Sequence, residues 1–179
     1  MMSNMAKQIW ISDIQDGNYD DSEVEIKGWI HRFRGSKKIW FMVIRDSTGT
    51  IQCVIKKEIV GEDVFNLLRN SLTESSLVIK GIVIQTDREH GRELQVTSGK
   101  IIGSVNPEKP YPITESAMEE AEGGETEFLL DNRHLYLRTS RMTKMLKIRS
   151  SVFSAIHSFF RDLDFIEYQA PNFVAGAVE

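Results

Sequence analysis

Basic side chains and potential base-binding groups are concentrated between residues 31 and 57. This window holds seven lysines and arginines against one acidic residue, Asp46. It also contains Phe41 and Gln52, preceded by a cationic stretch. The cations of that stretch are Arg32, Arg34, Lys37 and Lys38. Cations bind phosphates and an aromatic ring stacks on an unpaired base, so the window predicts a surface for single-stranded nucleic acid. The alternative is a solvated hairpin face with no partner.

Each expected contact has its own chemistry. Phe41 would stack on a base, which contributes about 1–3 kcal/mol. Gln52 would recognise the edge of that base, since an amide both donates and accepts hydrogen bonds, and Arg34 would hold the neighbouring base or phosphate. The alternative for Phe41 is core packing, because residues 39–44 are apolar on both faces. Trp40 faces the opposite side and is the better core candidate.

Motifs for other chemistries are missing from the sequence. It contains no GxxxxGK phosphate loop and no HExxH, GxSxG or CxxC. The four histidines are scattered without metal-ligand spacing, and the single cysteine, Cys53, is expected to be a buried small hydrophobe. We therefore predict no complete catalytic site and no metal site.

A sheet must display the nucleic-acid surface, and the hydrophobic patterns supply its strands. Strands are expected at 24–30, 39–45, 50–55, 77–84 and 92–96, the last with scope to extend to Ile102. A helix is expected at 58–70, between the third and fourth strands. This order predicts an all-β OB-fold, a five-stranded Greek-key barrel that binds single strands. The cations from Arg32 to Lys38 would lie in its first loop. An SH3-like barrel is the main alternative.

The composition changes after the barrel and predicts a domain boundary. We expect an OB-fold domain at 1–103, a linker at 104–127 and the start of a second domain at 128–179. The linker is rich in Pro and Glu, with seven glutamates and one lysine. A short helix capped by Thr114 is expected within it.

The second segment is dominated by one amphipathic pattern. Apolar residues recur at helical spacing across 140–163, and 165–170 is expected to form a strand that runs into Pro171. One helix and one strand cannot bury such a stripe alone. We therefore expect the chain either to dimerise through this segment or to be cut from a longer protein.

The overall composition is that of a globular protein. The 179 residues are 41% hydrophobic and 27% charged, with a net charge of −4. No apolar run reaches the roughly 20 residues of a membrane span, and the N-terminus has no secretory pattern. With one cysteine, a reducing, cytoplasmic location without membrane attachment is expected.

Three blocks of this sequence resemble class II aminoacyl-tRNA synthetases of the aspartate, asparagine and lysine subgroup. GWIHRFRGSKKIWFMVIRDSTGTIQCVI (28–55) resembles their anticodon-binding OB domain, and FLLDNRHLYLR (128–138) resembles the junction into their catalytic domain. KIRSSVFSAIHSFFRDLDFIEYQAP (147–171) resembles motif 1, a dimer-interface helix followed by a strand and a proline. RFRGSKKIWFMVIRD and RHLYLR are most similar to asparagine-specific members, and the aspartate-specific enzymes are the near alternative.

The resemblance implies specific anticodon contacts. The family's stacking Phe falls on Phe41, its base-recognising Gln on Gln52 and its loop arginine on Arg34. A contact from the last strand would fall at Gln95 or Glu93. The partner would be the anticodon loop of tRNA.

The motif 1 resemblance implies a homodimer. The implied interface residues are Val152, Phe153, Ile156, Phe160 and Pro171. Motif 1 usually has Gly where this chain has Asp164, and often Thr where it has Ala170. Glu179 falls on the acidic residue that contacts the ammonium group of the substrate amino acid.

Motifs 2 and 3 of the family are missing from this sequence. The parent enzyme would join asparagine to its tRNA with ATP and Mg²⁺, whereas these residues alone would bind no cofactor and would not activate the amino acid. Two further hypotheses stay open. One is a free-standing OB-fold module that binds single strands without sequence preference, and the other is a dimeric regulatory fragment.

Overall fold

The structure is a computed structural model that describes residues 9–87, 91–112 and 126–171. Its contacts divide the chain into two compact units, the first ending at Pro112. The expected short helix capped by Thr114 lies outside the described residues. Each unit is considered by itself, and the domain bounds expected from the sequence stay a prediction.

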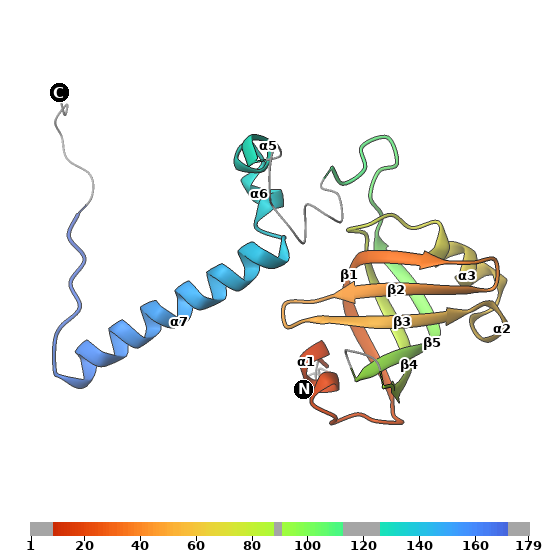
Figure 1. The fold of residues 1–179 in the computed structure, drawn as a ribbon, viewed down its shortest axis with the longest axis horizontal. Helices are drawn as coiled ribbons and strands as arrows, with labels where there is room; N and C mark the ends of the chain where they lie inside the picture. Colours follow the sequence, from red (N-terminus) through yellow and green to blue (C-terminus); the bar gives the residue numbers. More distant parts are fainter. Residues whose placement is uncertain (1–8, 88–90, 113–125, 172–179) are drawn as a thin grey trace, which may run out of the picture. The chain divides into compact units, whose positions relative to one another are not determined.

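The first unit is a closed five-stranded barrel (Figure 1). Its strands are β1 (Glu23–Gly35), β2 (Ile39–Arg45), β3 (Thr50–Lys56), β4 (Ser76–Gln85) and β5 (Arg92–Gly103). They are hydrogen-bonded in the order β1-β2-β3-β5-β4, with β3 and β5 parallel and the other pairs antiparallel. This order, with helices between β3 and β4, confirms the predicted OB-fold.

Alternation along the strands fills the barrel with apolar side chains. Val24, Ile26 and Ile30 of β1 are buried, while Glu25 and Lys27 between them are exposed. The same period places Ile51, Cys53 and Ile55 of β3 in the core. Because alternate residues of a strand face the core, the residues between them in β2 and β3 must lie on the outer face of the barrel.

Gly28 lets β1 bend around the barrel from β4 to β2. Residues 23–29 pair with β4, whereas residues 29–35 pair with β2. A Cβ atom at Gly28 would lie 2.5 Å from the carbonyl oxygen of Arg45. Only glycine allows this close approach of two backbones.

The helix expected at 58–70 is interrupted. It forms α2 (Lys57–Val60) and α3 (Glu62–Arg69), separated by Gly61, which has φ of 80°. Phe65 and Leu68 of α3 are buried in the barrel core. The positive φ of Gly61, which glycine adopts without steric cost, ends α2 and lets α3 begin in a new direction.

An additional helix, α1 (Ile11–Gln15), packs on the barrel although no sequence pattern predicted it. Ile11 and Ile14 are fully buried. The Asp46 carboxylate accepts hydrogen bonds from the backbone N–H of Ile11 at 2.9 Å and of Thr48 at 2.7 Å. The Asp46 side chain thus closes the turn between β2 and β3. It also accepts a hydrogen bond from a backbone N–H in the first turn of α1, which has no partner within the helix.

The second unit contains α5 (Thr126–Asp131), α6 (Arg133–Tyr136) and α7 (Ser140–Asp162). The observed α7 confirms the helix expected at 140–163, and the Thr139 hydroxyl caps it by accepting from the Met142 N–H at 3.3 Å. The strand expected at 165–170 is wrong, because these residues have no regular secondary structure. A strand needs a neighbour for its hydrogen bonds, and the segment meets none among the described residues.

A tight turn follows α7 and brings the chain back along it. The N–H of Phe165 donates to the carbonyl of Phe160 at 3.0 Å, and the two rings meet edge to face. Glu167 contacts both Arg161 and His157.

Within the described ranges, no helix is both long and apolar enough to cross a membrane.

Candidate nucleic-acid interface

Phe41 and Trp40 lie on opposite faces of β2. Trp40 packs against the core, as expected, and contacts Phe33 with a ring-centroid distance of 5.5 Å. Phe41 is half-buried and lies outside the core cluster, on the outer face. The core alternative for Phe41 is therefore wrong, and its ring is available at the barrel surface.

Arg34 lies directly opposite Phe41 across the β1–β2 pair. Its guanidinium carbon is 5.9 Å from the centroid of the Phe41 ring, a cation–π distance. The expectation that Arg32 and Arg34 lie in the first loop is wrong, because β1 continues to Gly35. Extended pairing with β2 holds both arginines at defined positions of the sheet.

Lys37 and Lys38 occupy the turn between β1 and β2, as expected. Both side chains are exposed. Among the contacts of the described residues, neither lysine makes an ion pair, so both charges face solvent at the end of the barrel beyond Phe41.

Gln52 and Glu93 face one another across the parallel pair of β3 and β5. The side-chain nitrogen of Gln52 donates to a carboxylate oxygen of Glu93 at 3.0 Å. This contact orients the amide, which keeps its oxygen and one N–H for a further partner. Of the two residues expected from the last strand, Glu93 touches Gln52, while Gln95 lies opposite Val54, whose other neighbour is Phe41.

The outer face therefore carries two rows of side chains across the strands. One row runs Arg34, Phe41, Val54, Gln95, and the next runs Arg32, Val43, Gln52, Glu93. The first row offers a cation and a ring, and the second offers an oriented amide and a carboxylate. Together they could stack a base and form hydrogen bonds to the edge of a base.

Two cations of the basic window serve the fold instead. Arg45 donates to both carboxylate oxygens of Glu74, at 2.9 and 3.1 Å, and Glu74 is almost fully buried. Lys57 pairs with Glu62 at 2.7 Å. From the sequence alone, Arg45 and Lys57 cannot be told from the other cations of the window. Their partners are Glu74, which is distant in sequence, and Glu62, which lies in the following helix.

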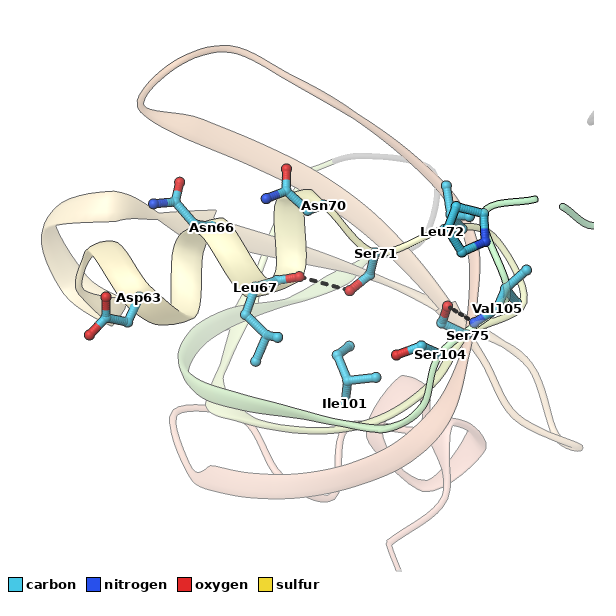
Figure 2. A pocket seen from close by; sticks show the side chains of 11 residues that line it. Asp63, Asn66, Leu67, Asn70, Ser71, Leu72, Ser75, Ile101, Ser104 and Val105 are labelled. Carbon is cyan, nitrogen blue, oxygen red and sulfur yellow. Dashed lines mark hydrogen bonds between the residues drawn. The ribbon is translucent and has the colours of Figure 1, made fainter. Parts of the chain in front are cut away.

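A separate hollow of about 560 Å³ lies beside α3 (Figure 2). Its wall includes Leu67, Leu72, Ile101, Val105, Asn66 and Asn70. The hydroxyl of Ser71 donates to the carbonyl of Leu67 at 2.8 Å, and that of Ser75 accepts from the N–H of Val105 at 3.1 Å. None of the predicted nucleic-acid-binding residues lines this hollow.

The remaining chemical groups have structural roles or stay apart. Cys53 is fully buried, and desolvation raises the pKa of its thiol, which makes it an inert core residue as expected. In the part of the chain that the structure describes, no group of three or more His, Cys, Asp or Glu side chains could hold a metal ion.

The four expected interface residues of α7 form an exposed apolar face. Exposed fractions are 52% for Val152, 50% for Phe153, 49% for Ile156 and 46% for Phe160. Pro171 is also exposed, and Glu179 lies outside the described residues. Such a face on a helix indicates an interaction surface.

Two family models match this chain. Residues 24–102 match an OB-fold nucleic acid binding domain, and residues 125–179 match tRNA synthetases class II (D, K and N). The two matches cover the barrel and the segment containing α5, α6 and α7.

Curated relatives include asparagine–tRNA ligases. That of Pelotomaculum thermopropionicum is 41% identical over 164 residues, which are 91% of this chain and 36% of the relative. That of Thermoplasma acidophilum is 36% identical over 170 residues, covering 94% of this chain and 37% of the relative. This chain therefore spans little more than a third of the length of these relatives.

Solved structures show the same fold. Asparaginyl-tRNA synthetase from Pyrococcus horikoshii, complexed with asparaginyl-adenylate, matches with a TM-score of 0.83 and 31% identity, covering 98% of this chain and 39% of that chain. Aspartyl-tRNA synthetase from Entamoeba histolytica matches with a TM-score of 0.82 and 21% identity, covering 94% of this chain and 40% of that chain. The second likeness shows the fold alone.

Proposed function

We propose that this chain, which belongs to the class II tRNA synthetases of the D, K and N group, binds the anticodon loop of tRNA on the outer face of β1, β2 and β3. The observation that carries the proposal is the Phe41 ring on the barrel surface, with Arg34 beside it and Gln52 on the neighbouring strand. On one sheet, the ring can stack on an unpaired base, the cation can contact the adjoining base or phosphate, and the amide can form hydrogen bonds to a base edge.

Each side chain has a role in this proposal. Phe41 stacks on a base, and Arg34 contacts the adjoining base or phosphate. Gln52, oriented by Glu93, forms hydrogen bonds to a base edge. Arg32, Lys37 and Lys38 bind phosphates. Gln95, which ends the row of Arg34, Phe41 and Val54 on β5, contacts the anticodon loop of the tRNA.

For a protein with the full length of these relatives, we propose asparagine as the substrate amino acid. Its support is that the sequence relatives named above are asparagine–tRNA ligases. The anticodons for asparagine and aspartate share their first two bases, so contacts to those bases do not separate the two amino acids. Aspartate is the alternative substrate.

The family uses ATP and Mg²⁺ in the complete enzyme. The sequence holds neither the motif 2 arginine that binds the α-phosphate of ATP nor motif 3. No activation step is therefore assigned to these residues. Glu179 is proposed to contact the ammonium group of the amino acid, and the cytoplasm is the proposed location.

The test is binding of tRNA with the asparagine anticodon against the same tRNA with its middle base changed. We expect the wild-type chain to prefer the unchanged tRNA. Phe41→Ala should weaken binding about 5- to 150-fold, because loss of one stacked base costs about 1–3 kcal/mol, and should remove most of the preference.

Phe128→Ala is the matched control. Phe128 is also a partly exposed phenylalanine, at 41%, but lies on α5. Its substitution should leave binding unchanged. Equal affinity of the wild-type chain for both tRNAs would favour a single-strand-binding module without sequence preference.

A further inference from the structure

We propose that Lys56, at the end of β3, is a further phosphate contact for the bound RNA strand. It would lie on the side of Phe41 that is remote from Gln52. The inference rests on the proposed function and adds to it the direction in which the sugar–phosphate backbone leaves the stacked base.

The register of β2 and β3 places Lys56 on the same face as Phe41. Lys56 still has extended dihedral angles, φ −104° and ψ 125°, so the alternation of β3 continues to it. Ile55 points into the core, and Lys56 therefore points outward. Phe41 pairs with Val54, which makes Lys56 the diagonal neighbour of the ring, at a Cα separation of about 7–8 Å.

Lys56 and Lys57 are adjacent in sequence but differ in their surroundings. Lys57 begins α2, its N–H donates to the carbonyl of Lys38 at 3.0 Å, and its ammonium group pairs with Glu62. Lys56 is half-buried and has no ion pair among the contacts of the described residues. Its long aliphatic stem can lie on the sheet while the charge stays in water.

Cations therefore lie on two sides of the Phe41 ring. Arg34 is directly opposite on β1, and Lys56 is diagonal on β3. The backbone contact between Lys57 and Lys38 also brings the end of β3 beside the turn that carries Lys37. An RNA backbone that leaves the ring toward this end meets the ammonium groups of Lys37, Lys38 and Lys56, none of which makes an ion pair among the described residues. Gln52 and Glu93 lie in the other direction along the strands.

The test compares Lys56→Gln with Lys57→Gln, which remove the same charge at adjacent positions. The affinity for tRNA with the asparagine anticodon is measured over a range of salt concentrations. Loss of one phosphate contact to a single strand should reduce the slope of log K against log salt by about 0.7 for Lys56→Gln. Lys57→Gln should keep the wild-type slope. Both variants should keep the preference for the middle base, since a phosphate contact carries no sequence information.

Lys56→Arg separates charge from packing and should retain the wild-type slope. The proposal is overturned if Lys56→Gln keeps the wild-type slope, if both glutamine variants lose slope equally, or if Lys56→Arg loses as much as Lys56→Gln. A wild-type chain that does not distinguish the two tRNAs would instead count against anticodon binding itself, so the two failures are distinguishable.

Discussion

At the scale of single residues, Asp164 shows how one backbone conformation accounts for a feature of motif 1. Its φ is +62°, in the left-handed region that follows many helices. The N–H of Asp164 donates to the carbonyl of Arg161, and the next residue bonds back to Phe160. Glycine adopts this conformation without steric cost, which gives a physical reason for the glycine that motif 1 usually has here.

Asp164→Gly should stabilise the end of α7. The left-handed conformation costs a residue with a Cβ about 1–2 kcal/mol, and the greater freedom of glycine in the unfolded chain offsets roughly 0.5–1 kcal/mol of the gain. We expect a net gain of up to about 1.5 kcal/mol in the free energy of unfolding, measured by circular dichroism. Asp164→Val should be destabilising, since branching at Cβ adds to the strain. A less stable glycine variant would contradict this explanation.

At the scale of elements, Arg92 ties the start of β5 to the segment after α1. Its guanidinium donates to both carboxylate oxygens of Asp20, at 2.5 and 2.9 Å, and to the carbonyl of Gln15 at 2.8 Å. Bidentate geometry makes this contact more specific than a single ion pair. The hydrogen bond to Arg92 lowers the pKa of Asp20 below its usual value of 3.8.

This pKa shift predicts a pH dependence of folding. Because the folded state holds the Asp20 proton less tightly than the unfolded state, the contact stabilises the fold fully above pH 3.8 and is lost as the pH falls through the lower, folded-state pKa. Thermal unfolding of wild type and Asp20→Asn should therefore differ most near neutral pH and converge in acid. In an Arg92→Gln background, Asp20→Asn should have little effect at any pH. A difference that persists below the folded-state pKa of Asp20, where the carboxyl is protonated in both states, would show a different origin.

At the scale of the whole molecule, the apolar face of α7 predicts self-association. Ile156 and Phe153 are about half exposed on this helix. A second copy of the same helix would remove both from water in a symmetric, isologous interface. Sedimentation should show an oligomer that dissociates on dilution, and Ile156→Asp should raise the dissociation constant at least 10-fold, because it would bury an unpaired charge.

Ile59→Asp is the matched control for this prediction. Ile59 has a similar exposed fraction, 43%, but lies on α2 beside the barrel. Its substitution should leave association unchanged. A wild-type chain that stays monomeric at high concentration would exclude α7 as a self-association surface.

The sequence by itself determined the five strands, the long helix and the shared sheet face of Phe41 and Gln52, whereas nucleic-acid binding at these residues stays a prediction. These depend on local information, because alternation assigns the two faces of a strand and helical spacing defines one stripe. Only the tertiary structure decided which cations are available, since Glu74 and Glu62 engage Arg45 and Lys57 through contacts that strand alternation does not encode. The same limit applies to Gln52 and Glu93, brought together by parallel pairing of β3 and β5. It also applies to residues 165–170, which are strand-like in sequence but meet no pairing strand among the residues that the structure describes.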